Sequence, residues 1–235
     1  MLSANLLFAQ PAGTRLAYEA ASVKLTASAN GGSHTDGTPG QILMQNMPLD
    51  RLIEMAYSVG PHRVAGPDWM SAVHVDIAAK YPPDTQGADK WLMLRSLLED
   101  SFKLATHRET KEMQGYALVV AKGGFKLKPV EPAGSDTHSS GGRVRTVTAK
   151  ATSLSYVADL AARSVGAVVA DKTGIDGVFD FELRWANGDP EGDRADDTPT
   201  IFVALQETLG LRLQAQKIPV EVIVVDHLEH TPVEN

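Results

Sequence analysis

The chain has 235 residues, 43% of them hydrophobic and 22% charged, which is the composition of an ordinary globular protein. Its formal net charge of −7, without any cluster of lysine or arginine, argues against a nucleic-acid-binding surface. The sequence contains no cysteine, which excludes a disulfide framework and a thiolate nucleophile, and no apolar run of the roughly 18 residues that span a membrane.

Residues 1–17 are expected to lie outside the folded region. The opening segment MLSANLLFAQ ends in a short apolar run before Pro11, which is typical of the end of a secretory leader or of an unstructured N-terminus. Residues 18–28 alternate well enough between apolar and polar side chains to predict a first strand. The glycine-rich segment 29–40 then predicts a loop.

Residues 18–128 are predicted to form an N-terminal α+β half. A strand near residues 41–46 precedes a helix that includes Pro48 in its first turn and carries one apolar stripe at helical spacing. The members of that stripe are Leu49, Leu52, Ile53 and Ala56. Further along, we expect a strand over 73–78, a helix over 88–101, and paired strands over 102–109 and 115–121.

The segment 129–142 (PVEPAGSDTHSSGG) is dominated by Pro, Gly and Ser, which predicts a linker. Residues 143–235 are predicted to form a C-terminal α+β half. This half is expected to contain a helix ending near residue 165, a strand over 178–185 whose core face carries Phe179, Phe181, Leu183 and Trp185, a helix over 201–209, and closing strands over 211–216 and 220–227.

The two halves resemble each other position by position. Three pairs lie 105 positions apart, namely Leu49 and Leu154, Ala56 and Ala161, and Val64 and Val169. After the loss of one residue, Val75-Asp76-Ile77 matches Phe179-Asp180-Phe181 at a spacing of 104. Two copies are too few for a solenoid. We therefore predict an α+β fold of two tandem, similar β-α-β-β-α-β-β halves packed into one compact body, with mainly antiparallel or mixed sheets.

His74 and Asp76 are the candidate catalytic residues. They are two positions apart on a predicted strand, so both side chains leave the same face. A carboxylate beside an imidazole raises its basicity and fixes its tautomer, as a general base requires. Two structural interpretations remain open. The first is a solvated strand face, and the second is a repeated role for Asp76 and its equivalent Asp180 in capping a turn.

The acidic segment NGDPEGDRADD is the candidate metal site. Carboxylates alternate with glycine in this stretch, and one such loop can supply several of the six to eight oxygen ligands of calcium. The candidate ligands are Asp189, Glu191, Asp193, Asp196 and Asp197. The alternative is a solvated surface loop.

Other catalytic centres lack their signatures in this sequence. There is no Gly-x-Ser-x-Gly nucleophile motif, and Gly32-Ser33-His34 and His138-Ser139-Ser140 lie in predicted loops without rigid support. His227 and His230 are three apart without a third ligand, which does not fit a zinc lactonase. We therefore expect no zinc, haem or nucleotide.

Five segments carry a resemblance to a known family: YEAASVK, DWMSAVHVDIAAK, FKLATHRETKEMQGYALVVAKGGFKLKP, VVADKTGIDGVFDFELRW and VIVVDHLEHTPVEN. They resemble, in the same order, the soil-associated acidobacterial (Solibacter-type) family carried as the domain of unknown function DUF3738. The resemblance covers nearly all of residues 18–235. It implies an exported protein, periplasmic or secreted, and gives no catalytic motif to transfer.

The group is also similar to a metagenome-derived quorum-quenching hydrolase of N-acyl-homoserine lactones. That similarity implies a secreted hydrolase of small lactone or ester signals, and the acidic segment described above adds calcium as its expected cofactor. The alternative is a non-catalytic extracytoplasmic module with a protein partner, because the helix-strand units look like the short N-terminal domains of secretins and TonB-dependent receptors. A likeness of fold alone does not decide between these functions.

Overall fold

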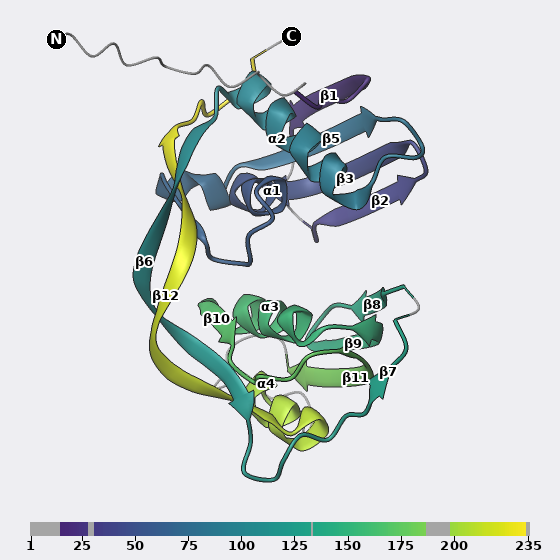
Figure 1. Ribbon diagram of the computed structural model, residues 1–235. Coiled ribbons are helices and arrows are strands. Elements are labelled where there is room, and N and C mark those ends of the chain that lie inside the picture. The colour runs from purple at the N-terminus through teal and green to yellow at the C-terminus, as the bar shows by residue number, and fades with distance from the viewer. Residues whose placement is uncertain (1–14, 28–30, 133, 187–197, 234–235) are drawn as a thin grey trace, which may run out of the picture. The chain divides into compact units, whose positions relative to one another are not determined.

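The computed structural model describes residues 15–27, 31–132, 134–186 and 198–233 (Figure 1). As expected, the chain is α+β, with antiparallel and mixed sheets. It divides into two compact units that interleave along the sequence. The first unit comprises Met1–Ser58, Gly66–His107 and Val225–Asn235, and the second comprises Val59–Ala65 and Arg108–Val224.

The first unit contains a four-stranded antiparallel sheet in the order β1-β5-β3-β2 (Figure 1). Its strands are β1 (Ala20–Leu25), β2 (His34–Thr38), β3 (Gln41–Pro48) and β5 (His74–Lys80), and its helices are α1 (Leu49–Ala56), the 3₁₀ turn η1 (Asp68–Ser71) and α2 (Gly87–Phe102). Buried and exposed residues alternate along β3, so one face of the sheet packs in the core and the other is open.

The core of the first unit forms where the helices meet the inner face of this sheet. All four residues of the predicted stripe on α1 are buried. Leu94, Leu98 and Phe102 of α2 are fully buried, as are Met44 and Ile77 of the sheet. The helical spacing of the apolar residues therefore correctly identified the buried side of α1.

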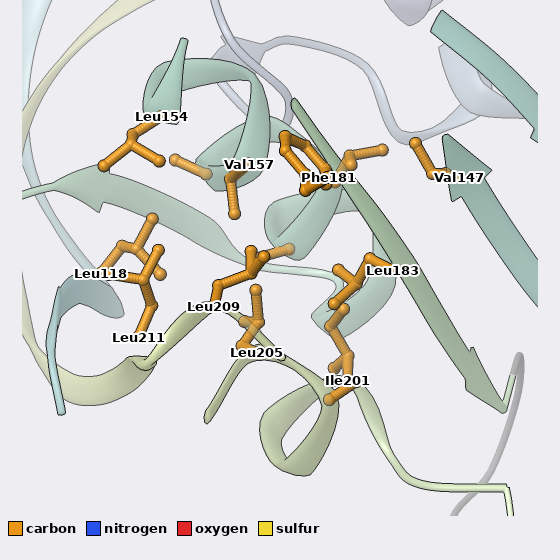
Figure 2. Packing of buried hydrophobic residues seen from close by; sticks show 14 of the residues in the cluster. Leu118, Val147, Leu154, Val157, Phe181, Leu183, Ile201, Leu205, Leu209 and Leu211 are labelled. Carbon is orange, nitrogen blue, oxygen red and sulfur yellow. The ribbon is translucent and has the colours of Figure 1, made fainter. Parts of the chain in front are cut away.

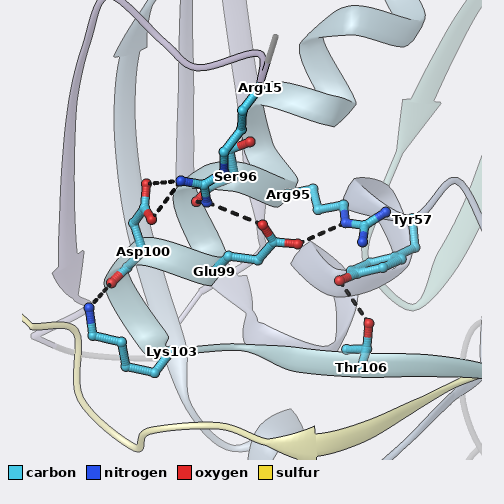
Figure 3. Close-up of polar contacts among 8 residues, drawn as sticks. All are labelled: Arg15, Tyr57, Arg95, Ser96, Glu99, Asp100, Lys103 and Thr106. Carbon is cyan, nitrogen blue, oxygen red and sulfur yellow. Dashed lines mark hydrogen bonds and ion pairs between the residues drawn. The ribbon is translucent and has the colours of Figure 1, made fainter. Parts of the chain in front are cut away.

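Polar contacts on the outer side of α2 hold the start of the described chain (Figure 3). The guanidinium of Arg15 donates to Asp100 at 2.8 Å and to Glu99 at 3.1 Å. Glu99 also accepts from Arg95, whose guanidinium lies over the ring of Tyr57. These partly exposed ion pairs fix side chains in place but contribute little net stability, on the order of 0–1 kcal/mol each.

The second unit contains a four-stranded antiparallel sheet in the order β7-β11-β9-β8. Its strands are β7 (Pro129–Val130), β8 (Asp136–Ser140), β9 (Val144–Thr152) and β11 (Val178–Ala186), and the helices of this unit are α3 (Leu154–Val165), α4 (Ile201–Ala204) and the π-helical turn η2 (Leu205–Leu209). The four residues of the predicted core face of β11 are all buried. Figure 2 shows Phe181 and Leu183 of this face among Val157 of α3 and Leu205 of η2.

The segment 129–142 differs from the expected linker because it supplies β7 and β8, both paired in this sheet. All five residues of β8 are exposed. An edge strand of this kind is held by backbone hydrogen bonds, so it needs no apolar alternation that sequence analysis would detect.

A third sheet has the order β10-β6-β12-β4. Its strands are β4 (Val64–Ala65), β6 (Ala105–Val120), β10 (Val168–Asp171) and β12 (Leu211–His227). β10 pairs with β6 and β4 pairs with β12, both in parallel. The prediction of two strands over 102–121 was wrong, since residues 109–114 contain no turn-forming residue. The prediction of two strands over 211–227 was also wrong, since Pro219 is accommodated within one continuous strand.

The two antiparallel sheets have matching register. Met44 lies opposite Ile77, and the equivalent positions pair Ala149 with Phe181. Both sheets then contain a β-bulge, before the pairs Met47–Val75 and Thr152–Phe179. Strand order and register thus follow the sequence spacings of 105 and 104, while the packing of two repeated halves into one body stays a prediction.

We predict that Gly115→Ala destabilises the second unit. A Cβ at Gly115 would lie 2.4 Å from the carbonyl oxygen of Val168 on β10, a backbone atom that cannot move aside cheaply. We expect a loss of about 1–3 kcal/mol in the free energy of unfolding, measured by urea denaturation. The matched control is Gly123→Ala, whose Cβ would meet no atom within 4 Å. Equal stability of the two variants would contradict the close approach.

Candidate functional site

Asp76 supports a bulge in β3. The bulge places Asn46 in the left-handed region, at φ 53°. The backbone N–H of Asn46 donates to Oδ1 of Asp76 at 2.8 Å, and the hydroxyl of Thr26 donates to the same oxygen at 2.8 Å. The carboxylate therefore satisfies a backbone donor that the bulge removes from the strand ladder.

His74 contacts the same residue at its carbonyl oxygen. Its Nδ1 lies 3.1 Å from the carbonyl oxygen of Asn46, which also accepts from the hydroxyl of Ser33 at 2.8 Å. His74 and Asp76 thus meet at the backbone of Asn46. Their contacts with Asn46 give both side chains a structural role at the bulge. Their catalytic role stays a prediction.

Asp180 occupies the equivalent place in the second unit. The N–H of Ala151, at φ 44°, donates to Oδ1 of Asp180 at 2.8 Å, and Nζ of Lys150 lies 3.4 Å from Oδ2. The hydrogen bond from Ala151, together with Lys150, lowers the pKa of Asp180 below its ordinary value. A carboxylate that supports a bulge therefore recurs at matching positions of both sheets.

The candidate calcium ligands lie outside the described residues, so their structure carries no argument here. They are Asp189, Glu191, Asp193, Asp196 and Asp197. Within the described ranges, no group of three or more His, Asp or Glu is placed to hold a metal ion. In the same ranges, none of the helices has the length and apolar character needed to cross a bilayer.

A groove of about 630 Å³ opens on the first sheet. Each of the four strands contributes three residues to it. The lining residues are Ala20, Ala21 and Ser22 of β1, Asp36, Gly37 and Thr38 of β2, Gln41, Ile42 and Leu43 of β3, and Ala78, Ala79 and Lys80 of β5. Most of these side chains are small or apolar, so the centre of the sheet is left hollow.

Strand register places the outward side chains of this groove in rows. One row runs Ser22, Ala78, Leu43, Asp36 across the four strands. Leu43 is 38% exposed, although a side chain of this size is usually buried. We call this outward surface, centred on Leu43 and Ala78, the outer groove.

The next row of the outer groove is polar at three of its four positions. It runs Ala20, Lys80, Gln41, Thr38, in the direction away from the bulge. At the opposite side, Nε2 of His34 lies 2.9 Å from Oδ2 of Asp36, on the edge strand β2. The groove therefore offers an apolar floor, a lysine at one end, and a carboxylate–imidazole pair at the other.

Sequence reasoning missed this groove. Its signal was the placement of Ala20 and Ala78 at positions of their strands that face outward, where polar residues are usual. That signal depends on register, because only the register shows that the small side chains lie beside Leu43.

The family model described as "Protein of unknown function (DUF3738)" matches residues 50–228. Neither the curated proteins nor the solved structures contain a match.

We predict that Asp76→Ala lowers the free energy of unfolding by about 1–3 kcal/mol, because the N–H of Asn46 and the hydroxyl of Thr26 lose their acceptor. Asp76→Asn should cost less, since its amide oxygen still accepts. Urea denaturation of both variants measures this. An Asp76→Ala variant as stable as the wild type would contradict the structural role.

The lowered pKa of Asp180 makes a pH-dependent contribution to stability. A carboxyl group with a lowered pKa stabilises the fold at pH values above its ordinary pKa. This contribution is lost as the pH falls through the lowered pKa. We therefore expect the wild type to exceed Asp180→Asn in urea midpoint at about pH 7, with the difference narrowing as the pH falls below about 4, the ordinary pKa of an aspartate. A constant difference across this range would contradict the assignment.

Proposed function

Since the chain belongs to the DUF3738 family of proteins of unknown function, we propose a function from its geometry: it binds a small amphipathic molecule in the outer groove, outside the cytoplasm. The observation that carries this proposal is the groove of about 630 Å³ with an apolar floor and polar ends. Small-molecule sites typically measure roughly 300–1,000 Å³ and are mostly apolar with a few polar groups. The location outside the cytoplasm rests on the family resemblance.

An aliphatic chain is the ligand part that suits the floor of the groove. Ala78 and Ser22 are short enough to leave room beside the exposed face of Leu43. Each methylene that leaves water there contributes about 0.8 kcal/mol. N-acyl-homoserine lactones combine such a chain with a polar head, and the resemblance to a lactone hydrolase makes them the class to test first.

Lactone hydrolysis is the second candidate function, favoured by the hydrogen-bonded His34–Asp36 pair beside the floor of the groove. In this scheme His34, oriented by Asp36, takes a proton from water. The resulting hydroxide adds to the lactone carbonyl, the ring C–O bond breaks, and the proton returns to the leaving oxygen. The product is the ring-opened hydroxy acid. Calcium is the proposed cofactor of such a hydrolase, with the acidic segment around Asp189 as its candidate ligands.

We predict that Leu43→Asp weakens binding of N-decanoyl-homoserine lactone by at least about tenfold, because a charge on the floor must be desolvated against the acyl chain. Isothermal titration calorimetry of the whole chain measures this. The matched control is Thr148→Asp, the equivalent position of the second sheet. The proposal fails if the folded wild type binds no ligand, or if both variants lose the same affinity.

For hydrolysis, turnover of N-hexanoyl-homoserine lactone should fall by about a hundredfold or more in His34→Ala, as expected when a general base is removed. His138→Ala is the matched control, because His138 forms the corresponding pair with Asp136 on β8. A parallel series with calcium, with EGTA, and with an Asp189→Ala/Asp193→Ala variant tests the metal. If the folded wild type binds the lactone without turnover, hydrolysis is excluded and binding remains the proposed function.

A further inference from the structure

We infer that the outer groove selects ligands with an anionic head group, and that Lys80 binds that head. The inference rests on the proposed function, since it assigns the chemistry of a ligand in the same groove. It concerns the last residue of β5, where the apolar floor gives way to a polar row.

Lys80 is fixed at the centre of this polar row. It lies opposite Ala20 on β1 and opposite Gln41 on β3, so it has a neighbouring strand on each side. Its carbonyl oxygen accepts from the N–H of Glu19 at 2.9 Å. The backbone that carries the side chain is therefore anchored, and Lys80 lines the groove.

The two charged residues of the groove lining, Asp36 and Lys80, differ in whether they have an ion-pair partner. Asp36 already has His34 as a partner at 2.9 Å, on the edge strand β2. Lys80 has no ion-pair partner among the residues that the structure describes, and it is the only lysine or arginine in the groove lining. An anionic head would supply the partner that Lys80 lacks, whereas a cationic head would meet the ammonium of Lys80.

The neighbours of Lys80 extend this recognition. Gln41 and Thr38 follow in the same row, and their amide and hydroxyl groups donate hydrogen bonds to carboxylate oxygens. The aliphatic tail would then extend over Ala78 and Leu43, in the adjacent row. The ligand class that fits is an aliphatic carboxylate, and the ring-opened product of an acyl lactone belongs to it.

The test compares ligands with one tail and different heads on the full chain. Decanoate, decanol and decylamine are titrated below their micellar concentrations by calorimetry. We expect decanoate to bind most tightly. Lys80→Gln should weaken decanoate by about tenfold and leave decanol within about twofold, whereas Lys80→Arg should retain decanoate binding. Lys24→Gln, on β1 but outside the groove lining, is the control and should change neither ligand.

The outcomes separate the two proposals. If decanol and decanoate bind equally and Lys80→Gln affects both alike, the head-group inference is overturned while the groove remains a binding site. If no ligand binds to folded protein, the proposed function itself fails. A loss of decanoate binding in Lys24→Gln equal to that in Lys80→Gln would also overturn the inference, because it would indicate a general charge effect.

Discussion

The hydrogen bond from the N–H of Asn46 to Asp76 is the interaction on which the outer groove depends. It holds one residue of β3 in a left-handed conformation and so fixes the bulge between β3 and β5. Because side chains alternate along a strand, a slip of one residue would exchange Leu43 with Met44. This partly buried carboxylate contact thus determines which side chains form the core and which form the groove.

An aspartate supports the bulge in the second sheet as well, yet the outward surface of that sheet is different. Asp180 supports the bulge at Ala151, and the register matches that of the first sheet. The positions equivalent to Leu43 and Ala78 carry Thr148 and Glu182, which are polar. The hollow apolar surface is therefore a property of particular side chains, since the shared backbone arrangement supports both surfaces.

The periodicity of apolar residues predicted which faces of individual helices and strands are buried. The stripe on α1 and the core face of β11 follow from periodicity and are buried. Strand length could not be predicted, because β6 continues through polar residues that pair only with distant strands. The sequence placed His74 and Asp76 on one face, but their shared partner Asn46 lies about thirty positions earlier, and no short-range pattern indicates it.

The two candidate activities require opposite orientations of a ligand in the groove. Hydrolysis requires the lactone carbonyl beside His34 and Asp36, so the acyl tail must point toward the row of Lys80. Recognition of an anionic head at Lys80 directs the tail the other way, over Ala78 and Leu43 toward β2. A ring-opened product is anionic, whereas the intact lactone is neutral. A groove that favours the anion would therefore retain the product of such a reaction, which fits a binding protein better than a catalyst with rapid turnover.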